Sequence, residues 1–151
     1  MKKILPVVLL CMSLLLCGCN NNFAKREYNA NDKIASRADR YSKVNSVFNP
    51  IDGGYSLEVG KFDGRETLWK QEYDEDKEIE IQMKLTLTAG TVKIVSIDDD
   101  DNVTTLLECT PDTVESDYVT KTVSLTKGRN RIKIVCAGCE NISFQMLSSE
   151  F

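Results

Sequence analysis

The chain has 151 residues, and its 19 Lys and Arg stand against 23 Asp and Glu, which gives a formal net charge of −4. Histidine is absent from the sequence, which excludes Ser-His-Asp and Cys-His nucleophile arrangements and the His-Glu-x-x-His zinc helix. The acidic balance disfavours nucleic-acid binding, because phosphates are bound by clustered Lys and Arg.

Residues 1–18 have the features of an export signal. Lys2 and Lys3 supply a positively charged start, and an apolar run follows from Ile4 to Leu16. This run has 13 residues, whereas a helix needs about 20 apolar residues to cross a bilayer. The pattern therefore predicts a signal peptide that is removed during export.

The end of this signal, Leu16-Cys17-Gly18-Cys19, resembles the lipobox of bacterial lipoprotein precursors. The resemblance implies that Cys19 is acylated with diacylglycerol and becomes the first residue of the mature chain. Cys17 is an unusual occupant of its position in that motif. Two or three acyl chains anchor a protein stably, so we expect a protein anchored by lipid to the extracytoplasmic face of the cell membrane.

Residues 19–46 are predicted to be the lipidated cysteine followed by a polar tether. They are rich in Asn, Lys, Arg, Ala and Ser, a composition typical of a spacer. A flexible segment of this length spans on the order of 25–30 Å, which would lift the folded part off the headgroups. Residues 20–44 carry a net charge of +3 and residues 45–151 a net charge of −9, so the tether should lie nearer an anionic leaflet than the domain does.

Residues 47–151 are predicted to form one all-β domain. In the clearest strand, from Glu78 to Thr88, apolar residues occupy every odd-numbered position, as in a half-buried antiparallel strand. Turn residues such as Asp63-Gly64 and Ala137-Gly138 separate further strands. These strands are expected at residues 55–62, 67–73, 91–97, 103–109, 119–125, 131–136 and 142–147. About eight short strands, each with one buried face, predict a two-sheet antiparallel β-sandwich, a jelly roll.

Trp69 and Tyr73 are the candidate ligand-binding residues, because the two rings share one face of a predicted strand and could stack on a sugar. A lone tryptophan in a small sandwich is more often part of the core. Leu68 is adjacent and leaves open which face is buried. We expect Trp69 to belong to the core.

A run of acidic residues, Asp98-Asp99-Asp100-Asp101-Asn102, stands between two predicted strands. Clustered oxygens of this kind can bind Ca²⁺, but the spacing does not match an EF-hand loop. The run lies where a hairpin must turn, so we interpret it as a solvated turn and treat its four aspartates as weak metal candidates. No cofactor is expected.

Cys109, Cys136 and Cys139 remain as thiols once Cys19 is acylated. Cys136 and Cys139 have the spacing of a disulfide or a redox pair, and export would permit a disulfide. Cys136 also continues the apolar face of its strand, which makes buried thiols the alternative. The strand-to-helix setting of redox pairs is missing, which disfavours a redox role.

The C-terminal residues resemble a known family. Residues 123–134, followed by residues 141–146, are similar to the closing hairpin and last strand of carbohydrate-binding modules with the galactose-binding-domain-like jelly roll. In this pattern Gly128 and Asn130 form the turn, and Ile132 and Ile134 enter the core. The resemblance covers about 25 residues and implies the fold more than the function.

The leading functional hypothesis is a non-enzymatic binding module for a glycan or an envelope partner. The alternative is a structural or accessory lipoprotein that docks on another envelope protein. A small carboxylate-based glycoside hydrolase is the third hypothesis. Paired acids such as Asp74, Asp76, Glu78 and Glu80 could cleave a glycosidic bond, but any acidic strand contains such pairs, so they are weak support for an enzyme. An exposed aromatic shelf would favour the first hypothesis, and a broad apolar patch the second.

Overall fold

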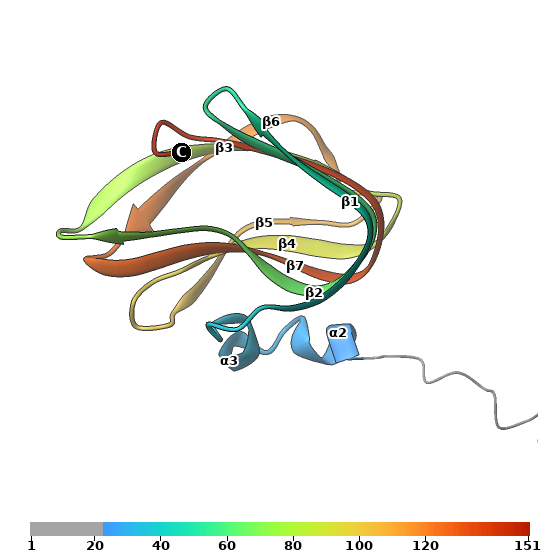
Figure 1. The fold of residues 1–151 in the computed structure, drawn as a ribbon, viewed down its shortest axis with the longest axis horizontal. Helices are drawn as coiled ribbons and strands as arrows, with labels where there is room; N and C mark the ends of the chain where they lie inside the picture. Colours follow the sequence, from blue (N-terminus) through green and yellow to red (C-terminus); the bar gives the residue numbers. More distant parts are fainter. Residues whose placement is uncertain (1–22) are drawn as a thin grey trace, which may run out of the picture.

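The computed structural model describes residues 23–151 (Figure 1). The predicted signal peptide and Cys19 lie outside these residues. Two short helices, α2 (Phe23–Glu27) and α3 (Asn31–Ile34), precede seven strands. The strands are β1 (Arg40–Ile51), β2 (Gly54–Tyr73), β3 (Lys77–Thr86), β4 (Ala89–Ile97), β5 (Val103–Cys109), β6 (Glu115–Leu125) and β7 (Gly128–Leu147). Neither helix of the described part is long and apolar enough to cross a bilayer.

All strand pairs are antiparallel, and the strands form two facing layers. The C-terminal half of β7 pairs with β3, and β3 pairs with β6; we call this the β3–β6 layer. The N-terminal half of β7 pairs with β4, and β4 pairs with β5; this is the β4–β5 layer. β2 follows β7 through both layers, and the two strands curve together at one end of the molecule (Figure 1). The predicted all-β antiparallel sandwich is confirmed.

The bends of β2 and β7 stand where the sequence predicted turns between separate strands. The register of β2 shifts between Phe62 and Gly64, which marks a bulge, and bulges bend a strand. Gly64 has a φ of +106°, and a Cβ there would lie 2.1 Å from the carbonyl oxygen of Arg40, so glycine is required. Across the bend, the Gly138 N–H donates to the Asp63 carboxylate at 2.6 Å. The four strands predicted here are therefore two continuous ones.

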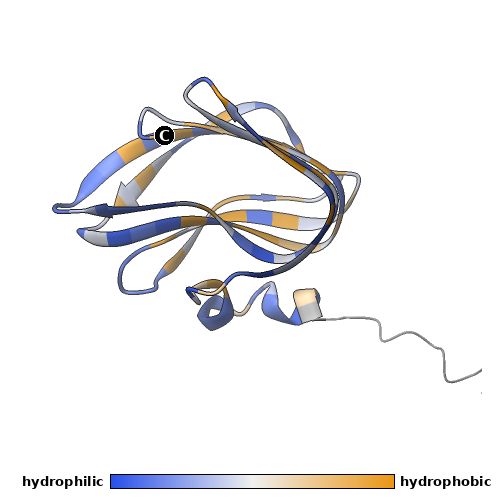
Figure 2. Ribbon diagram, in the orientation of Figure 1, coloured by the Kyte–Doolittle hydropathy of each residue, from blue (hydrophilic) through white to orange (hydrophobic). Residues whose placement is uncertain are grey.

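The main core lies between the two layers. Ile81, Met83 and Leu85 of β3 are fully buried, whereas the neighbouring Glu80 and Gln82 are exposed. The alternation predicted for this strand is therefore confirmed, and Figure 2 shows hydrophobic and hydrophilic residues alternating along the strands. Apolar side chains of the β4–β5 layer complete the core, among them Val92, Ile94, Ile132 and Ile134.

The C-terminal resemblance was right about the turn and wrong about the hairpin. Asn130 accepts from the Thr126 N–H at 3.0 Å and donates to the Thr126 carbonyl at 2.6 Å. Ile132 and Ile134 are fully buried. However, β6 pairs with β3, and β7 starts in the opposite layer. The turn between β6 and β7 therefore connects the two layers. β6 buries its apolar face from one side of the core, and the start of β7 does so from the other side.

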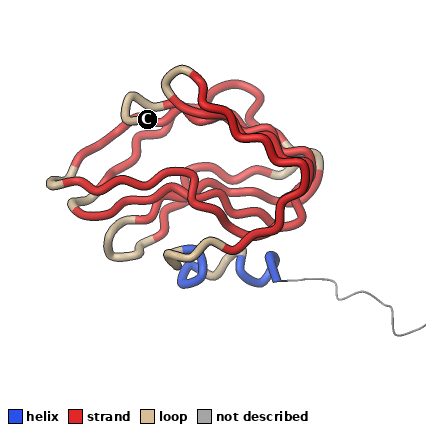
Figure 3. Tube along the Cα trace, viewed as in Figure 1, coloured by secondary structure: helices blue, strands red, loops and turns tan. Residues whose placement is uncertain are grey.

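The segment predicted as a tether is folded from residue 23 onward, so the predicted domain boundary at residue 47 is wrong. Residues 23–39, which we call the N-terminal segment, lie on the outer side of the β4–β5 layer, where both helices are found (Figures 1 and 3). Ile34 is fully buried there in a second apolar cluster with Tyr28, Val95 and Val135. Residues 40–51 form β1, which pairs with β2 along its length.

Buried cations also hold the N-terminal segment. The Lys133 ammonium is fully buried and donates to the Ser36 carbonyl at 2.6 Å and to Asp39 Oδ1 at 3.0 Å. An unpaired buried charge costs several kcal/mol, so this lysine needs the segment as its partner. Three other buried cations contact the same segment: Arg131 at the Ala35 carbonyl, Arg65 at Glu27, and Lys93 at Asn29.

Candidate functional site

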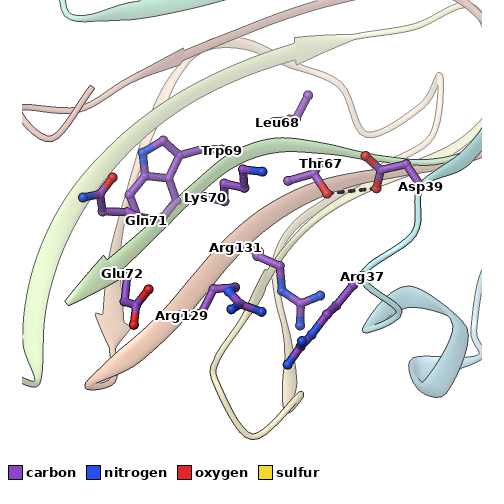
Figure 4. A pocket seen from close by; sticks show the side chains of 10 residues that line it. All are labelled: Arg37, Asp39, Thr67, Leu68, Trp69, Lys70, Gln71, Glu72, Arg129 and Arg131. Carbon is purple, nitrogen blue, oxygen red and sulfur yellow. Dashed lines mark hydrogen bonds between the residues drawn. The ribbon is translucent and has the colours of Figure 1, made fainter. Parts of the chain in front are cut away.

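A groove of about 850 Å³ runs along the end of β2 (Figure 4). β1 begins at Arg40, opposite Arg65, so the following residues of β2 have a strand partner on the β7 side and a free edge on the other. We call this concavity the edge groove. Its lining residues are Arg37, Asp39, Thr67, Leu68, Trp69, Lys70, Gln71, Glu72, Arg129 and Arg131.

The strand register decides which of these side chains share a face. Lys70 is opposite Arg131, and Glu72 is opposite Arg129, so these four side chains lie on the outer face of the β4–β5 layer. Trp69 is opposite Ile132, a core residue, and therefore points toward the inside of the sandwich. The edge groove thus has an apolar wall on the inner side and a charged wall on the outer side.

The edge groove is positively charged on an otherwise acidic domain. Four cations line it against two carboxylates, although residues 45–151 carry a net charge of −9. Within residues 23–151, the side chains of Arg37, Lys70 and Arg129 have no hydrogen bond or ion pair. Cations without an internal partner are free to bind an anion.

Arg131 forms the buried end of the charged wall. Its side chain is 6% exposed, pairs with Asp101 and donates to the Ala35 carbonyl at 2.7 Å. Its Nε has no hydrogen-bond partner among the described residues. Figure 4 shows its guanidinium group and that of Arg37 on the same side of the groove. Tertiary contacts therefore fix Arg131, while Arg37 and Arg129 extend beside it.

Asp39 is a carboxylate held in its charged form. It accepts a hydrogen bond from Thr67 Oγ1 at 2.9 Å and one from Lys133 Nζ at 3.0 Å. Burial alone would raise the pKa of Asp39, but the hydrogen bonds from Thr67 and Lys133 outweigh burial and hold this pKa below its ordinary value. A general acid needs a raised pKa. Asp39 is therefore suited to holding Thr67 and Lys133 in place and not to donating a proton.

Of the two aromatic candidates, the structure brings Trp69 to the groove and leaves Tyr73 out of it. The half-buried Trp69 packs against the main core, with its ring centroid 5.6 Å from that of Phe151. Tyr73 donates to Glu150 at 3.1 Å, and the Lys77 ammonium lies 4.9 Å from its ring centroid. The two rings are 6.4 Å apart, but only the indole lines the groove.

The arginines of the groove were missed as candidates, although part of their signal is in the sequence. Arg129, Arg131 and Lys133 alternate with the core residues Ile132 and Ile134, so period-two spacing already places three cations on one face of a strand. Arg37 has no comparable signal, because its position depends on how the N-terminal segment folds.

The four aspartates predicted as a turn connect β4 to β5. Asp98 accepts from the Asn102 N–H at 2.8 Å, and Asp99 accepts from the Arg129 N–H at 3.1 Å. Asp101 pairs with Arg131. Three of the carboxylates thus bind groups of the protein itself, and residues 23–151 contain no Cys, Asp and Glu cluster that could hold a metal ion.

The cysteines are buried thiols in the structure, and the pair predicted as a disulfide candidate is not bonded. Cys139 donates to the Thr91 carbonyl at 2.9 Å. Burial raises the pKa of Cys136, whereas the hydrogen bond from Cys136 lowers the pKa of Cys139. Both thiols lie at the bend of β7, and neither lines the edge groove.

The acids considered for glycoside hydrolysis lie outside the groove. Asp74, Asp76, Glu78 and Glu80 are all exposed. Asp76 accepts from the Lys127 N–H at 2.6 Å. These carboxylates face solvent, whereas hydrolysis needs two carboxyl groups on either side of a bound sugar.

Four apolar side chains of the edge strand β1 are exposed away from the groove. Tyr41, Val44, Val47 and Phe48 are each about half exposed, from 48% to 55%. We call these residues the β1 apolar row. Val47 and Phe48 are consecutive and therefore point to opposite faces of β1, so exposed apolar groups flank both sides of this edge strand.

Neither a known protein family nor a curated protein sequence matches the chain. Among solved structures, a variant of a family 29 carbohydrate-binding module is 14% identical, with a TM-score of 0.43 over 74% of this chain and 79% of that one. Another variant of it, in complex with mannohexaose, is 14% identical, with a TM-score of 0.42 over 75% and 82%. A family 35 module from Paenibacillus barcinonensis is 14% identical, with a TM-score of 0.37 over 72% and 91%. Similarity at this level assigns no ligand to the chain.

Proposed function

We propose that the chain is a lipid-anchored extracytoplasmic protein whose β-sandwich binds a glycan in the edge groove without catalysing a reaction. The observation that carries this proposal is the groove itself, in which a half-buried indole stands beside a charged wall where the side chains of Arg37, Lys70 and Arg129 have no partner within residues 23–151. Sugars are bound by this combination, because an aromatic ring packs on the apolar face of a pyranose while polar groups bind its hydroxyls.

The charge of the groove favours glycans that contain acidic sugars. A guanidinium group binds a carboxylate with two parallel hydrogen bonds, and charge-assisted bonds are roughly twice as strong as neutral ones. Arg37 and Arg129 have no internal partner within residues 23–151, so neither has to break a contact to bind such a group. Neutral glycans would leave these cations without an anion.

Glycan binding is tested by retention of the chain on an immobilised acidic oligosaccharide and on the same oligosaccharide after its carboxyl groups are reduced to alcohols. The acidic form should bind more tightly, and Arg129→Gln should weaken its binding roughly 10- to 150-fold, because a hydrogen bond to a charged group contributes about 1.5–3 kcal/mol. Lys121→Gln, at an exposed residue of β6 that does not line the groove, is the matched control. Failure to bind either form would refute the glycan proposal.

The anchor is supported by the lipobox resemblance at Cys19. A Cys19→Ala chain should remain an unprocessed precursor and take up no labelled fatty acid, because the diacylglyceryl group is attached to the cysteine sulfur. Acylation and membrane retention of the variant would contradict the lipoprotein proposal.

The β1 apolar row supports a second candidate function, docking on an envelope protein. Val47 and Phe48 are more than half exposed on an edge strand, and such edges pair with other chains. Phe48→Ser would then abolish co-purification of a partner and leave glycan retention unchanged, since Phe48 does not line the edge groove.

A further inference from the structure

The distance between the lipid anchor and the folded part of the chain is short. The first described residue is Phe23, four residues beyond Cys19. Four residues span at most about 14 Å, because an extended chain advances no more than ~3.6 Å per residue. If Cys19 carries the lipid, as the proposed function holds, α2 is kept close to the headgroups. A tether of 25–30 Å, as the sequence predicted, would have left the orientation of the domain free.

The N-terminal segment cannot rotate independently of the sandwich. Tyr28 donates to Glu108 of β5 at 2.9 Å, and Glu27 pairs with Arg65 of β2. Lys133 of β7 donates to the Ser36 carbonyl. Contacts to three strands fix the segment on the outer side of the β4–β5 layer, so an anchor at its start also orients the whole domain.

The charge of α2 matches an anionic lipid surface. Lys25 and Arg26 are exposed and have no hydrogen bond or ion pair within residues 23–151. Residues 23–39 carry a net charge of +1, whereas residues 45–151 carry a net charge of −9. Phospholipid anions attract Lys and Arg within a Debye length, about 8 Å at physiological salt, and the reach from Cys19 brings α2 into this range.

The acidic turn of residues 98–102 opposes this attraction, because it also lies on the outer side of the β4–β5 layer, below β4 and β5 in Figure 1. Asp101 pairs with Arg131 and Asp99 accepts from the Arg129 N–H, which offsets part of its charge. The turn and α2 lie toward opposite ends of that face in Figure 1. A domain tilted with α2 toward the lipid keeps the turn farther from the headgroups.

We propose that the N-terminal segment is the membrane-facing surface of this protein and that Lys25 and Arg26 of α2 bind anionic phospholipid headgroups. This proposal rests on the lipid anchor of the proposed function. The charged wall of the edge groove lies on the same outer side of the β4–β5 layer, beside the acidic turn, because Asp101 pairs with Arg131 and Asp99 accepts from the Arg129 N–H. The β3–β6 layer then faces away from the membrane.

The test uses the full chain acylated at Cys19 in vesicles of phosphatidylcholine, with and without phosphatidylglycerol. A fluorophore is placed at Lys33→Cys on α3 or, as control, at Lys121→Cys on β6, and nitroxide-headgroup lipids serve as quenchers. The natural thiols are 0–1% exposed and stay unlabelled. The label at residue 33 should be quenched more strongly than the label at residue 121, and more strongly on anionic than on neutral vesicles.

Charge removal tests the electrostatic part. Lys25→Gln with Arg26→Gln should lower the ratio of docked to undocked domains roughly fivefold for each charge, since one cation near an anionic leaflet contributes about 1 kcal/mol. Circular dichroism shows whether this variant keeps its fold.

Equal quenching of the two labels in chains that stay on the vesicles would overturn the orientation and leave the anchor in place. Equal quenching at residue 33 on anionic and neutral vesicles would overturn the role of the anionic lipid. Chains that are not retained would overturn the anchor, and the orientation with it.

Discussion

Replacing Ile34 with Ala tests whether the N-terminal segment is an integral part of the folded domain. Ile34 is fully buried in the second apolar cluster. The change removes three carbon groups, which is about 2.4 kcal/mol at ~0.8 kcal/mol per buried methylene, and the cavity left behind adds to this. Alanine recovers a few tenths of a kcal/mol in helix propensity. We expect the free energy of unfolding to fall by about 2–3 kcal/mol.

Urea unfolding followed by the fluorescence of the single tryptophan, Trp69, measures this loss. The urea midpoint should fall by roughly 1–2 M, because small domains have m-values of about 1–3 kcal/mol/M. Lys33→Ala is the control: Lys33 is the adjacent residue, and its side chain is 53% exposed. If Ile34→Ala and Lys33→Ala both change the free energy of unfolding by less than ~0.5 kcal/mol, the segment does not contribute to the fold and the membrane orientation loses its rigid support.

Two further predictions concern the core and the pH dependence of stability. Ile81→Asp should unfold the domain because it places a charge at a fully buried position, whereas Glu80→Ala on the exposed face should shift stability by less than ~0.5 kcal/mol; equal thermal shifts would contradict the alternation. Burial, strengthened by a hydrogen bond to Glu108, raises the pKa of Tyr28. The folded state therefore keeps a proton that the unfolded state releases near pH 10, so stability should fall as the pH rises above about 10. Tyr28→Phe should flatten this fall in urea titrations at several pH values, and an unchanged slope would count against the burial of the phenol.

The all-β fold class could be predicted from the sequence because the alternation of apolar and polar residues that identifies a strand is a local pattern. From Glu78 onward the alternation in β3 is complete, and the odd-numbered side chains from Ile79 to Leu85 are buried as expected. At the bends of β2 and β7 the sequence predicts turns, since Gly64 and Gly138 have a positive φ and glycine adopts a positive φ in turns and in bulges alike. Only the pairing of the two strands distinguishes these cases, and pairing is a property of distant residues.

The candidate site could be predicted only in part. Trp69 was singled out by its residue type, and it does line the groove. The N-terminal segment was missed because its composition is polar, while the partners that hold it are buried cations such as Arg65 and Lys133, far along the chain. The pattern of a single sequence can indicate which apolar residues are buried. It cannot indicate that Lys133 is buried, because the carbonyl that it binds belongs to Ser36, 97 residues away.

The continuity of β2 and β7 through both layers has a consequence for motion. In a sandwich whose layers are joined by loops alone, one sheet can slide or hinge against the other at little cost in hydrogen bonding. Here the two 20-residue strands pair with each other on both sides of the bend, with a bulge between Phe62 and Gly64, so a large relative displacement of the layers would strain the ladders on either side of it. Slow amide hydrogen exchange should therefore extend along both strands up to the bulge from each side, and the walls of the edge groove should keep their spacing whether or not a ligand is bound.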